Sequence, residues 1–402
     1  MGLNENEGHD VLTRITASPK KYAWGSLSAI PKFLGKEPDG SPQAELWLGA
    51  HPDSTTRLVD KADTQPETLN EWIRDQPETT LGSGSRLPFL LKLLAADKPL
   101  SLQAHPTLER ARVAFAEEEA RGIPRDSPAR NYKDEWHKPE LIVALHDGFE
   151  GLCGFRPLGE TDDFLRHLCT GDEEDRSQVA QLRAHLNLDG LEHAVRWILI
   201  DRPPGLVNEL VEAAATRDVG RWENEARLLR RLDEQYPGDP GVAVASLLNF
   251  AILQAGEALF LPAGNVHAYV KGLGVEIMAA SDNVLRGGLT SKHVDVDEFL
   301  AVVDFTPLRS PIILGTVAPS AYVEYQVPSH DFRLLRVDRD TTTELDLSHA
   351  GIALVVSGQV TVTQGDQSLV LNQGEAVFIS PSHPRVGVRS SGTVFIATGA
   401  EA

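Results

Sequence analysis

The sequence predicts a mainly β protein with an α-helical insertion, in which the strands form two small β-barrels. Two β-rich regions flank a block where apolar residues recur at helical spacing, and one segment pattern occurs in both β regions. The chain has 402 residues, enough for two or three domains. We expect one domain from 1–154 together with 255–310, a helical insertion at 155–254, and a C-terminal β domain at 311–402.

The first β region mixes short apolar segments with glycine and proline. The segments 45–49, 87–94 and 141–145 are largely apolar, which is typical of buried strands. A helix is expected over 108–120, and its acidic run at 117–119 is interpreted as a solvated face.

The insertion contains several helix signals. Thr-Asp-Asp at 161–163 predicts an N-cap before Phe164, and the apolar residues at 179, 182 and 186 and at 228, 229 and 232 predict amphipathic helices. Asp239 and Pro240 predict an N-cap and a first helical residue. We expect that helix to run through Ile252 and to end at Gly256.

The C-terminal region is nearly all strand and turn. The segments 352–356 and 360–363 predict a β-hairpin across Ser357 and Gly358, and a turn at 364–366 leads into 369–371. The segment 374–381 repeats the pattern of 256–262, an apolar strand between Gly-Glu and proline. Because the later copy lacks the Gly-x-x-His step that follows the earlier one, we interpret the C-terminal barrel as a related barrel without ligands.

Composition and charge limit the partners. The formal net charge of −20 argues against non-specific binding to nucleic acid or to an anionic membrane. The two cysteines favour a reducing compartment and are interpreted as small buried apolar residues. The first ten residues do not resemble a signal peptide, and no run approaches the ~18 apolar residues that span a bilayer. We therefore expect a cytoplasmic protein, and a monomer.

Four polar side chains occur in settings suited to metal binding. Gln103 and His105 are two residues apart in an extended segment, so their side chains should share one face. His267 follows a strand and a Pro/Gly turn, and Glu140 adds a carboxylate. Two imidazoles, a carboxylate and an amide oxygen suit a divalent ion such as zinc, with one position open for water or substrate.

The ordered motifs of the chain resemble those of the type I phosphomannose isomerases, a family of the cupin superfamily. The Gly-x5-Pro-x-Gly-x2-His spacing at 256–267 is similar to a cupin barrel motif. The other matching segments are 22–26 (YAWGS), 44–49 (AELWLG), 100–106 (LSLQAHP), 131–134 (NYKD), 137–140 (HKPE), 264–269 (GNVHAY) and 281–292 (SDNVLRGGLTSK).

This resemblance implies a fold, a cofactor and a reaction. The fold would consist of cupin-type, jelly-roll β-barrels, a metallated N-terminal and central one and a degenerate C-terminal one. One Zn²⁺ per chain would be held by Gln103, His105, Glu140 and His267, and Arg286 would be an active-site residue. The enzyme would interconvert mannose 6-phosphate and fructose 6-phosphate through a metal-stabilised enediolate, so its partner would be a small phosphorylated sugar.

The proton-transfer group has two candidates. Lys138 is separated from Glu140 only by Pro139 and should lie near the metal, and Glu276 could act as a carboxylate base. Arg286 keeps its proton in proteins, so we interpret it as stabilising the enediolate or binding phosphate.

Further residues are expected to hold the substrate. Phosphate is expected to bind Lys92, Arg286, Lys292 and Ser101. The rest of the pocket is expected to include Trp24, Glu45, Tyr269 and Asp282.

Two alternatives compete with isomerisation. Two histidines and a carboxylate could hold iron in a cupin oxygenase, which oxygen consumption would reveal. The chain could also be a non-catalytic sugar-phosphate-binding protein, which would bind the sugar phosphate without turnover.

Overall fold

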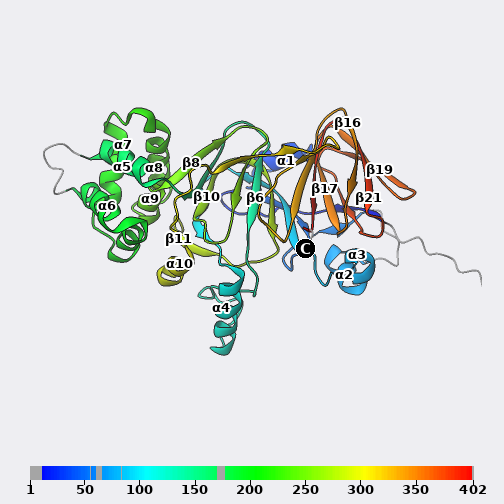
Figure 1. Cartoon of the computed structure of the whole chain (residues 1–402), viewed down its shortest axis with the longest axis horizontal. Coiled ribbons are helices and arrows are strands. Elements are labelled where there is room, and N and C mark those ends of the chain that lie inside the picture. Colours follow the sequence, from blue (N-terminus) through cyan, green and yellow to red (C-terminus); the bar gives the residue numbers. More distant parts are fainter. Residues whose placement is uncertain (1–10, 55, 60–65, 83, 170–176, 401–402) are drawn as a thin grey trace, which may run out of the picture.

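The computed structural model describes residues 11–54, 56–59, 66–82, 84–169 and 177–400. Antiparallel sheets form the centre and one end of the molecule, and a cluster of helices forms the other end (Figure 1). The predicted fold class, mainly β with a helical insertion, is confirmed. The strand orders of the described residues end at edge strands, so the expected barrels are open sheets.

The central ten-stranded sheet is organised around one long strand, β10. Strand β10 pairs with β4, β5, β6 and β7, so it contacts every segment expected to carry metal ligands. The three strands expected at 45–49, 87–94 and 141–145 are confirmed as β2, β4 and β6, with small shifts at their ends. The strands of this sheet are β2 (Glu45–Gly49), β4 (Phe89–Ala96), β5 (Leu102–Ala104), β6 (Glu140–Ala144), β7 (Phe149–Phe155), β8 (Leu248–Leu253), β9 (Glu257–Leu261), β10 (His267–Ala279), β11 (Leu285–Gly288) and β12 (Ile312–Leu314).

An eight-stranded and a four-stranded sheet form the C-terminal end of the molecule. The eight-stranded sheet contains β1 (Leu12–Thr16), β3 (Arg57–Leu58), β13 (Thr316–Val317), β14 (Val323–Glu324), β15 (Arg333–Val337), β17 (Gly351–Ser357), β20 (Ala376–Ile379) and β22 (Thr393–Thr398). The four-stranded sheet contains β16 (Thr341–Asp346), β18 (Gln359–Gln364), β19 (Gln367–Asn372) and β21 (Arg385–Ser390). Buried valines and leucines of both sheets form one apolar core.

The hairpin predicted across Ser357 and Gly358 is wrong. Strand β17 pairs with β20 and β22, whereas β18 pairs with β19 and β21 in the other sheet. The short turn therefore carries the chain from one sheet to the other. The next turn does connect paired strands, because β18 and β19 are antiparallel neighbours.

The helices are α1 (Ala29–Phe33), α2 (Leu69–Asp75), α3 (Pro77–Leu81), α4 (Leu108–Ala120), α5 (Leu158–Leu168), α6 (Gln178–Arg196), α7 (Leu206–Thr216), α8 (Glu223–Gln235), α9 (Pro240–Ala245) and α10 (Val296–Val302). The helices expected around residues 108–120, 179–186 and 228–232 are confirmed as α4, α6 and α8. None of the helices in the described ranges has both the length and the apolar content that crossing a bilayer requires.

Two helix predictions in the insertion are wrong. The segment after Pro157 is already helical, so α5 begins at Leu158, before the expected N-cap at 161–163. Asp239 does cap α9, accepting a hydrogen bond from the Gly241 N–H, but this helix ends at Ala245. The following apolar segment is strand β8, which pairs with β7, and Gly256 lies in the turn to β9.

The expected domain boundaries stay a prediction, and two strand pairings bear on them. Strand β1 from the start of the chain pairs with β20, and β12 pairs with β9 of the central sheet. A shared apolar core also joins the two β regions, since it includes Leu91 and Val275 from the centre and Ile352 and Phe378 from the C-terminal end. Strands β4 and β10 of the central sheet therefore pack against the C-terminal β region.

Candidate metal centre and active site

His105, Glu140 and His267 converge in the interior of the central sheet. Glu140 is the first residue of β6 and His267 the first of β10, while His105 directly follows β5. The Glu140 carboxylate lies 3.3 Å from His105 Nε2 through Oε1 and 3.4 Å from His267 Nε2 through Oε2. Each histidine is fully buried, and one ligand atom from each of the three side chains lies within 4.8 Å of the others.

Backbone carbonyls orient both imidazoles. His105 Nδ1 is 2.8 Å from the Asn283 carbonyl oxygen, and His267 Nδ1 is 3.0 Å from the Asn265 carbonyl oxygen. A carbonyl only accepts, so each Nδ1 donates its proton and each Nε2 presents a lone pair to the centre. Burial also lowers the pKa of His105 to about 4, which keeps this imidazole neutral near pH 7.

The unsatisfied atoms and the charge balance both fit a divalent cation. His105 Nε2, His267 Nε2 and Glu140 Oε2 are buried and accept no hydrogen bond from the residues that the structure describes, although buried polar atoms normally have a partner. Three buried carboxylates, Glu45, Glu140 and Glu276, are paired with two ammonium groups among the described residues, those of Lys92 and Lys138. A doubly charged ion would occupy the free nitrogen and oxygen donors and offset the excess negative charge. This donor set suits zinc.

Gln103 lies beside this centre. Its position in β5 is directly opposite His267 in β10 and opposite Arg286 in β11. Residues directly opposite in an antiparallel pair share a face of the sheet, so Gln103 lies on the face that carries His267. Its side chain is partly exposed, unlike the three buried ligands.

Lys138 contacts a ligand directly. Its Nζ is 2.9 Å from Glu140 Oε1, and the residue is 8% exposed. Burial opposes ionisation of Glu140, but the ammonium of Lys138 and the neighbouring imidazoles hold the pKa of this carboxyl well below its usual range. Glu140 is therefore a carboxylate that is ready to bind a cation.

A second buried network surrounds Glu276. Lys92 and Glu276 are directly opposite in β4 and β10, with Nζ 2.9 Å from Oε2, and Glu45 Oε1 is 3.4 Å from the same ammonium. Burial opposes the charge of Lys92, but the Glu276 and Glu45 carboxylates raise its pKa. Tyr269 donates its hydroxyl to Glu276 Oε1 at 2.7 Å, and Trp47 Nε1 donates to Glu45 at 2.9 Å. Sequence reasoning missed Trp47.

Cationic side chains lie at the edge of the site. Arg286 belongs to β11 and is partly buried, and burial lowers its pKa. Lys292 is exposed, and burial of part of its side chain together with the nearby charges of Arg286 and Lys133 lowers its pKa. Arg286 and Lys133 therefore lie close enough to Lys292 for their charges to act on it. Lys133 was missed as a candidate. Ser101 is partly buried at the start of the segment that carries Gln103.

The two remaining predicted pocket residues have structural contacts. Asp282 is paired with His51, whose Nε2 lies 3.2 Å from Asp282 Oδ2. Trp24 is partly buried, stacks on Tyr22 with ring centroids 5.8 Å apart, and packs against an apolar cluster of the central sheet. His51 had no recognisable sequence signal, because it approaches Asp282 only in the folded chain.

Asn283 connects the metal centre to the loop that precedes Glu140. Its side-chain oxygen accepts the N–H of Lys133 at 2.8 Å, and its amide nitrogen donates to the carbonyls of Asp134 and Trp136, each at 2.8 Å. The carbonyl of the same residue holds the His105 imidazole. Asn283 lies in the motif at 281–292, but the sequence alone indicated no role for it.

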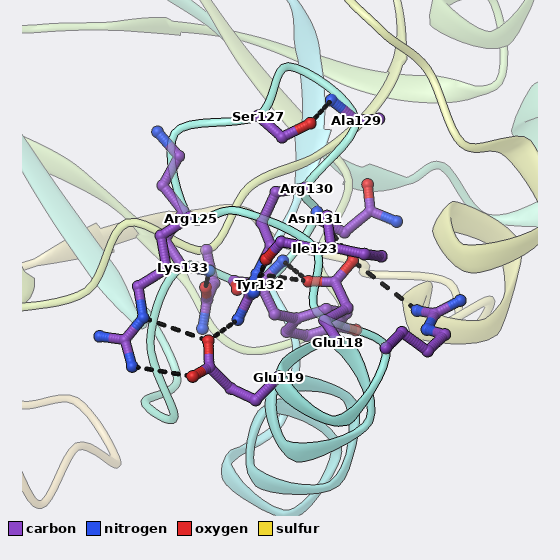
Figure 2. A network of polar contacts seen from close by, with 12 residues as sticks. Glu118, Glu119, Ile123, Arg125, Ser127, Ala129, Arg130, Asn131, Tyr132 and Lys133 are labelled. Carbon is purple, nitrogen blue, oxygen red and sulfur yellow. Dashed lines mark hydrogen bonds and ion pairs between the residues drawn. The ribbon is translucent and has the colours of Figure 1, made fainter.

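The start of this loop is held by the acidic run of α4, shown in Figure 2. Glu118 is 3% exposed, forms an ion pair with Arg130 at 3.0 Å, and accepts the backbone N–H of Tyr132 at 2.8 Å. The prediction of a solvated acidic face is therefore wrong for Glu118. Glu119 is exposed and pairs with Arg125 and Arg130.

A cavity of about 690 Å³ lies elsewhere, between the central sheet and the C-terminal strands. It is lined by residues such as Lys32, Leu145, Arg336 and Phe395, and by none of the predicted site residues. His105, Glu140 and His267 therefore lie at the buried polar centre and not along this cavity.

Comparisons with known proteins agree with the site. A family model described as phosphomannose isomerase type I, catalytic domain, matches residues 12–158. The mannose-6-phosphate isomerase of Escherichia coli (strain K12) is 35% identical over 398 residues, covering 95% of this chain and 98% of that protein. The human mannose-6-phosphate isomerase is 32% identical over 404 residues, covering 91% and 92%.

Solved structures extend the likeness to the fold. A mannose 6-phosphate isomerase bound with zinc and yttrium has a TM-score of 0.86 and 31% identity, covering 97% of this chain and 100% of that one. The Salmonella typhimurium enzyme bound to its substrate, fructose 6-phosphate, and to zinc has the same TM-score, identity and coverage.

The fold and the buried His–Glu–His centre define a metal-dependent enzyme of the cupin-like β class. The relatives span nearly the whole chain and carry the name of one isomerase. The chain belongs to the type I phosphomannose isomerase family. The resemblance inferred from the motifs is thus confirmed, and neither the oxygenase nor the non-catalytic alternative is favoured by these relatives.

Proposed function

We propose that this chain is a zinc-dependent aldose–ketose isomerase that interconverts mannose 6-phosphate and fructose 6-phosphate. The observation that carries this proposal is the set of three buried, unsatisfied ligand atoms on His105, Glu140 and His267. These three residues occur in a chain whose relatives are named for that activity, and the crystal structure of one relative contains zinc and fructose 6-phosphate. We assign Gln103 as the fourth ligand because it is directly opposite His267.

The reaction moves one proton between adjacent carbons through an enediolate. When bound, zinc acts as a Lewis acid that stabilises the developing oxyanion. The protein must add an acid/base group near the two carbons and a grip on the phosphate that orients the reacting end.

Lys138 and Glu276 remain the two candidates for proton transfer. Lys138 is supported by its 2.9 Å contact with the Glu140 ligand, which keeps its ammonium at the metal centre. Glu276 is supported by its burial, which raises the pKa of its carboxyl towards the working range of a base, against the opposing effect of Lys92. The pH–rate profiles of Lys138→Met and Glu276→Gln distinguish the two candidates, because only the loss of the base removes the limb of the profile that reports its ionisation.

We assign phosphate binding to Arg286, Lys292 and Ser101, and add Lys133. The charges of Arg286 and Lys133 repel the Lys292 ammonium in the free enzyme, and a doubly charged phosphate would relieve that repulsion. For Lys92 we propose a different role from phosphate binding. It is 5% exposed between Glu45 and Glu276, so its charge is already compensated and serves to hold Glu276.

The experiment that tests the function is a coupled assay on mannose 6-phosphate with metal analysis of the same sample. A chelator should abolish turnover and zinc should restore it, and Glu140→Ala should lose one equivalent of zinc together with its activity. Exposed Glu192→Ala is the matched control and should keep both. Full turnover by metal-free protein would refute zinc dependence, and a zinc content in Glu140→Ala equal to that of the unaltered chain would refute the ligand assignment.

We also propose a cytoplasmic, monomeric enzyme. The chain has only two cysteines, Cys153 and Cys169, and both are buried, which supports a reducing compartment. Light scattering on the eluted protein checks the monomer, since a mass near twice 43.8 kDa would contradict it.

A further inference from the structure

A kink inside α6 brings two histidines and an aspartate together on the surface of the helical insertion. Gly190 interrupts the helix with φ 82° and ψ −174°, a conformation that favours glycine. His185 and Asp189 precede the kink and His193 follows it. In a straight helix, eight residues would separate the two histidines by roughly 12 Å along the axis. Their ring centroids are instead 4.9 Å apart.

The three side chains offer a compact set of donors. One ligand atom from each lies within 4.8 Å of the other two, and His193 Nε2 is 3.7 Å from Asp189 Oδ2. The His185 ring packs on Trp197 with centroids 4.6 Å apart, which limits its rotation. Asp189 and His193 are exposed, with side chains 52% and 47% accessible, so an ion can reach the site from solvent.

We propose that His185, Asp189 and His193 form a second metal site, which takes one divalent transition-metal ion such as Zn²⁺ or Ni²⁺. Two imidazoles and one carboxylate favour these ions over Mg²⁺ and Ca²⁺, which prefer sets made only of oxygen ligands. Water completes the coordination because only three protein donors converge. The bound ion links residues from both sides of Gly190 and therefore fixes the kink.

This site is separate from the catalytic centre. Its three residues belong to α6 in the helical cluster, whereas the catalytic ligands lie on the central sheet (Figure 1). None of the three contributes to the isomerase centre, so their replacement should leave turnover unchanged.

The test is a calorimetric titration of untagged enzyme, whose catalytic centre already holds one equivalent of zinc, with Ni²⁺ and separately with Mg²⁺. We expect one further equivalent of Ni²⁺ and no binding of Mg²⁺. His193→Gln and Asp189→Asn should each weaken Ni²⁺ binding at least about 10-fold, since loss of an outer partner of a metal ligand alone costs about 10–100-fold. His330→Gln, at an exposed histidine outside the cluster, should keep the full second equivalent.

Two results would overturn the proposal. One is the absence of a second equivalent in the unaltered enzyme. The other is a second equivalent that persists with unchanged affinity in both His193→Gln and Asp189→Asn. Circular dichroism and the isomerase assay on each variant confirm that the fold and the catalytic centre are intact.

Discussion

Replacing Asn283 with alanine should weaken both the fold and the grip on zinc. The Asn283 side chain is fully buried and makes three hydrogen bonds of 2.8 Å, to the Lys133 N–H and to the carbonyls of Asp134 and Trp136. A buried hydrogen bond contributes about 1 kcal/mol net, so losing three should lower the free energy of unfolding by about 3 kcal/mol. The backbone carbonyl of residue 283 would remain, but less firmly placed against His105.

Zinc affinity provides the specific readout. Outer partners that orient a metal-ligating histidine typically contribute 10–100-fold to affinity, so we expect zinc to bind Asn283→Ala about 10-fold more weakly. Urea unfolding of zinc-free protein measures the stability, and competition with a chelator measures the affinity. Asn224 is exposed, and its side-chain oxygen accepts a hydrogen bond from Arg227 at 2.9 Å, so Asn224→Ala should change neither quantity. An Asn283→Ala variant with unaltered stability and affinity would refute the reasoning.

Three further predictions concern the buried groups. Tyr269→Phe removes the hydroxyl that donates a hydrogen bond to Glu276, which should raise the pKa of Glu276 further. The acid limb of the pH–rate profile should then move to higher pH, and an unmoved limb would exclude Glu276 as the base. Lys92→Met leaves the Glu45 and Glu276 carboxylates without their compensating charge. In urea unfolding of zinc-free protein, it should lower the free energy of unfolding by about 3–5 kcal/mol. Lys98→Met, at an exposed lysine, should change it by less than about 0.5 kcal/mol. Burial lowers the pKa of His105 from 6.5 to about 4, so the unfolded chain takes up this proton first as pH falls. As pH falls from 6.5 to 4, the free energy of unfolding of zinc-free protein should therefore decrease by about 3 kcal/mol through this group. A His105→Gln variant should lack that part of the decrease.

Local motifs indicated the candidate metal centre because His105, Glu140 and His267 each lie at a strand end or turn with a recognisable sequence. Gln103, His105 and His267 could be placed from strand alternation and from a Pro/Gly turn. Partners distant in the chain could not be found in that way. Asn283 and Lys133 are 150 positions apart, and only folding brings them together.

The errors have equally local causes. The segment after Ala245 is a short apolar run, and such a run does not distinguish a helix from a buried strand; pairing with β7 decides in favour of β8. The turn at Ser357 and Gly358 indicates a change of direction but not the sheet to which the next strand belongs. The burial of Glu118 depends on Arg130, which follows the helix and folds back onto it.

X-ray absorption at the zinc edge tests the central claim most directly. The His193→Gln variant, loaded with one equivalent of zinc, confines the signal to the catalytic centre. We predict only nitrogen and oxygen ligands at about 2.0–2.2 Å, with the scattering of two imidazoles. Sulfur at about 2.3 Å, or a spectrum without two imidazoles, would contradict a zinc ion held by His105, His267 and Glu140.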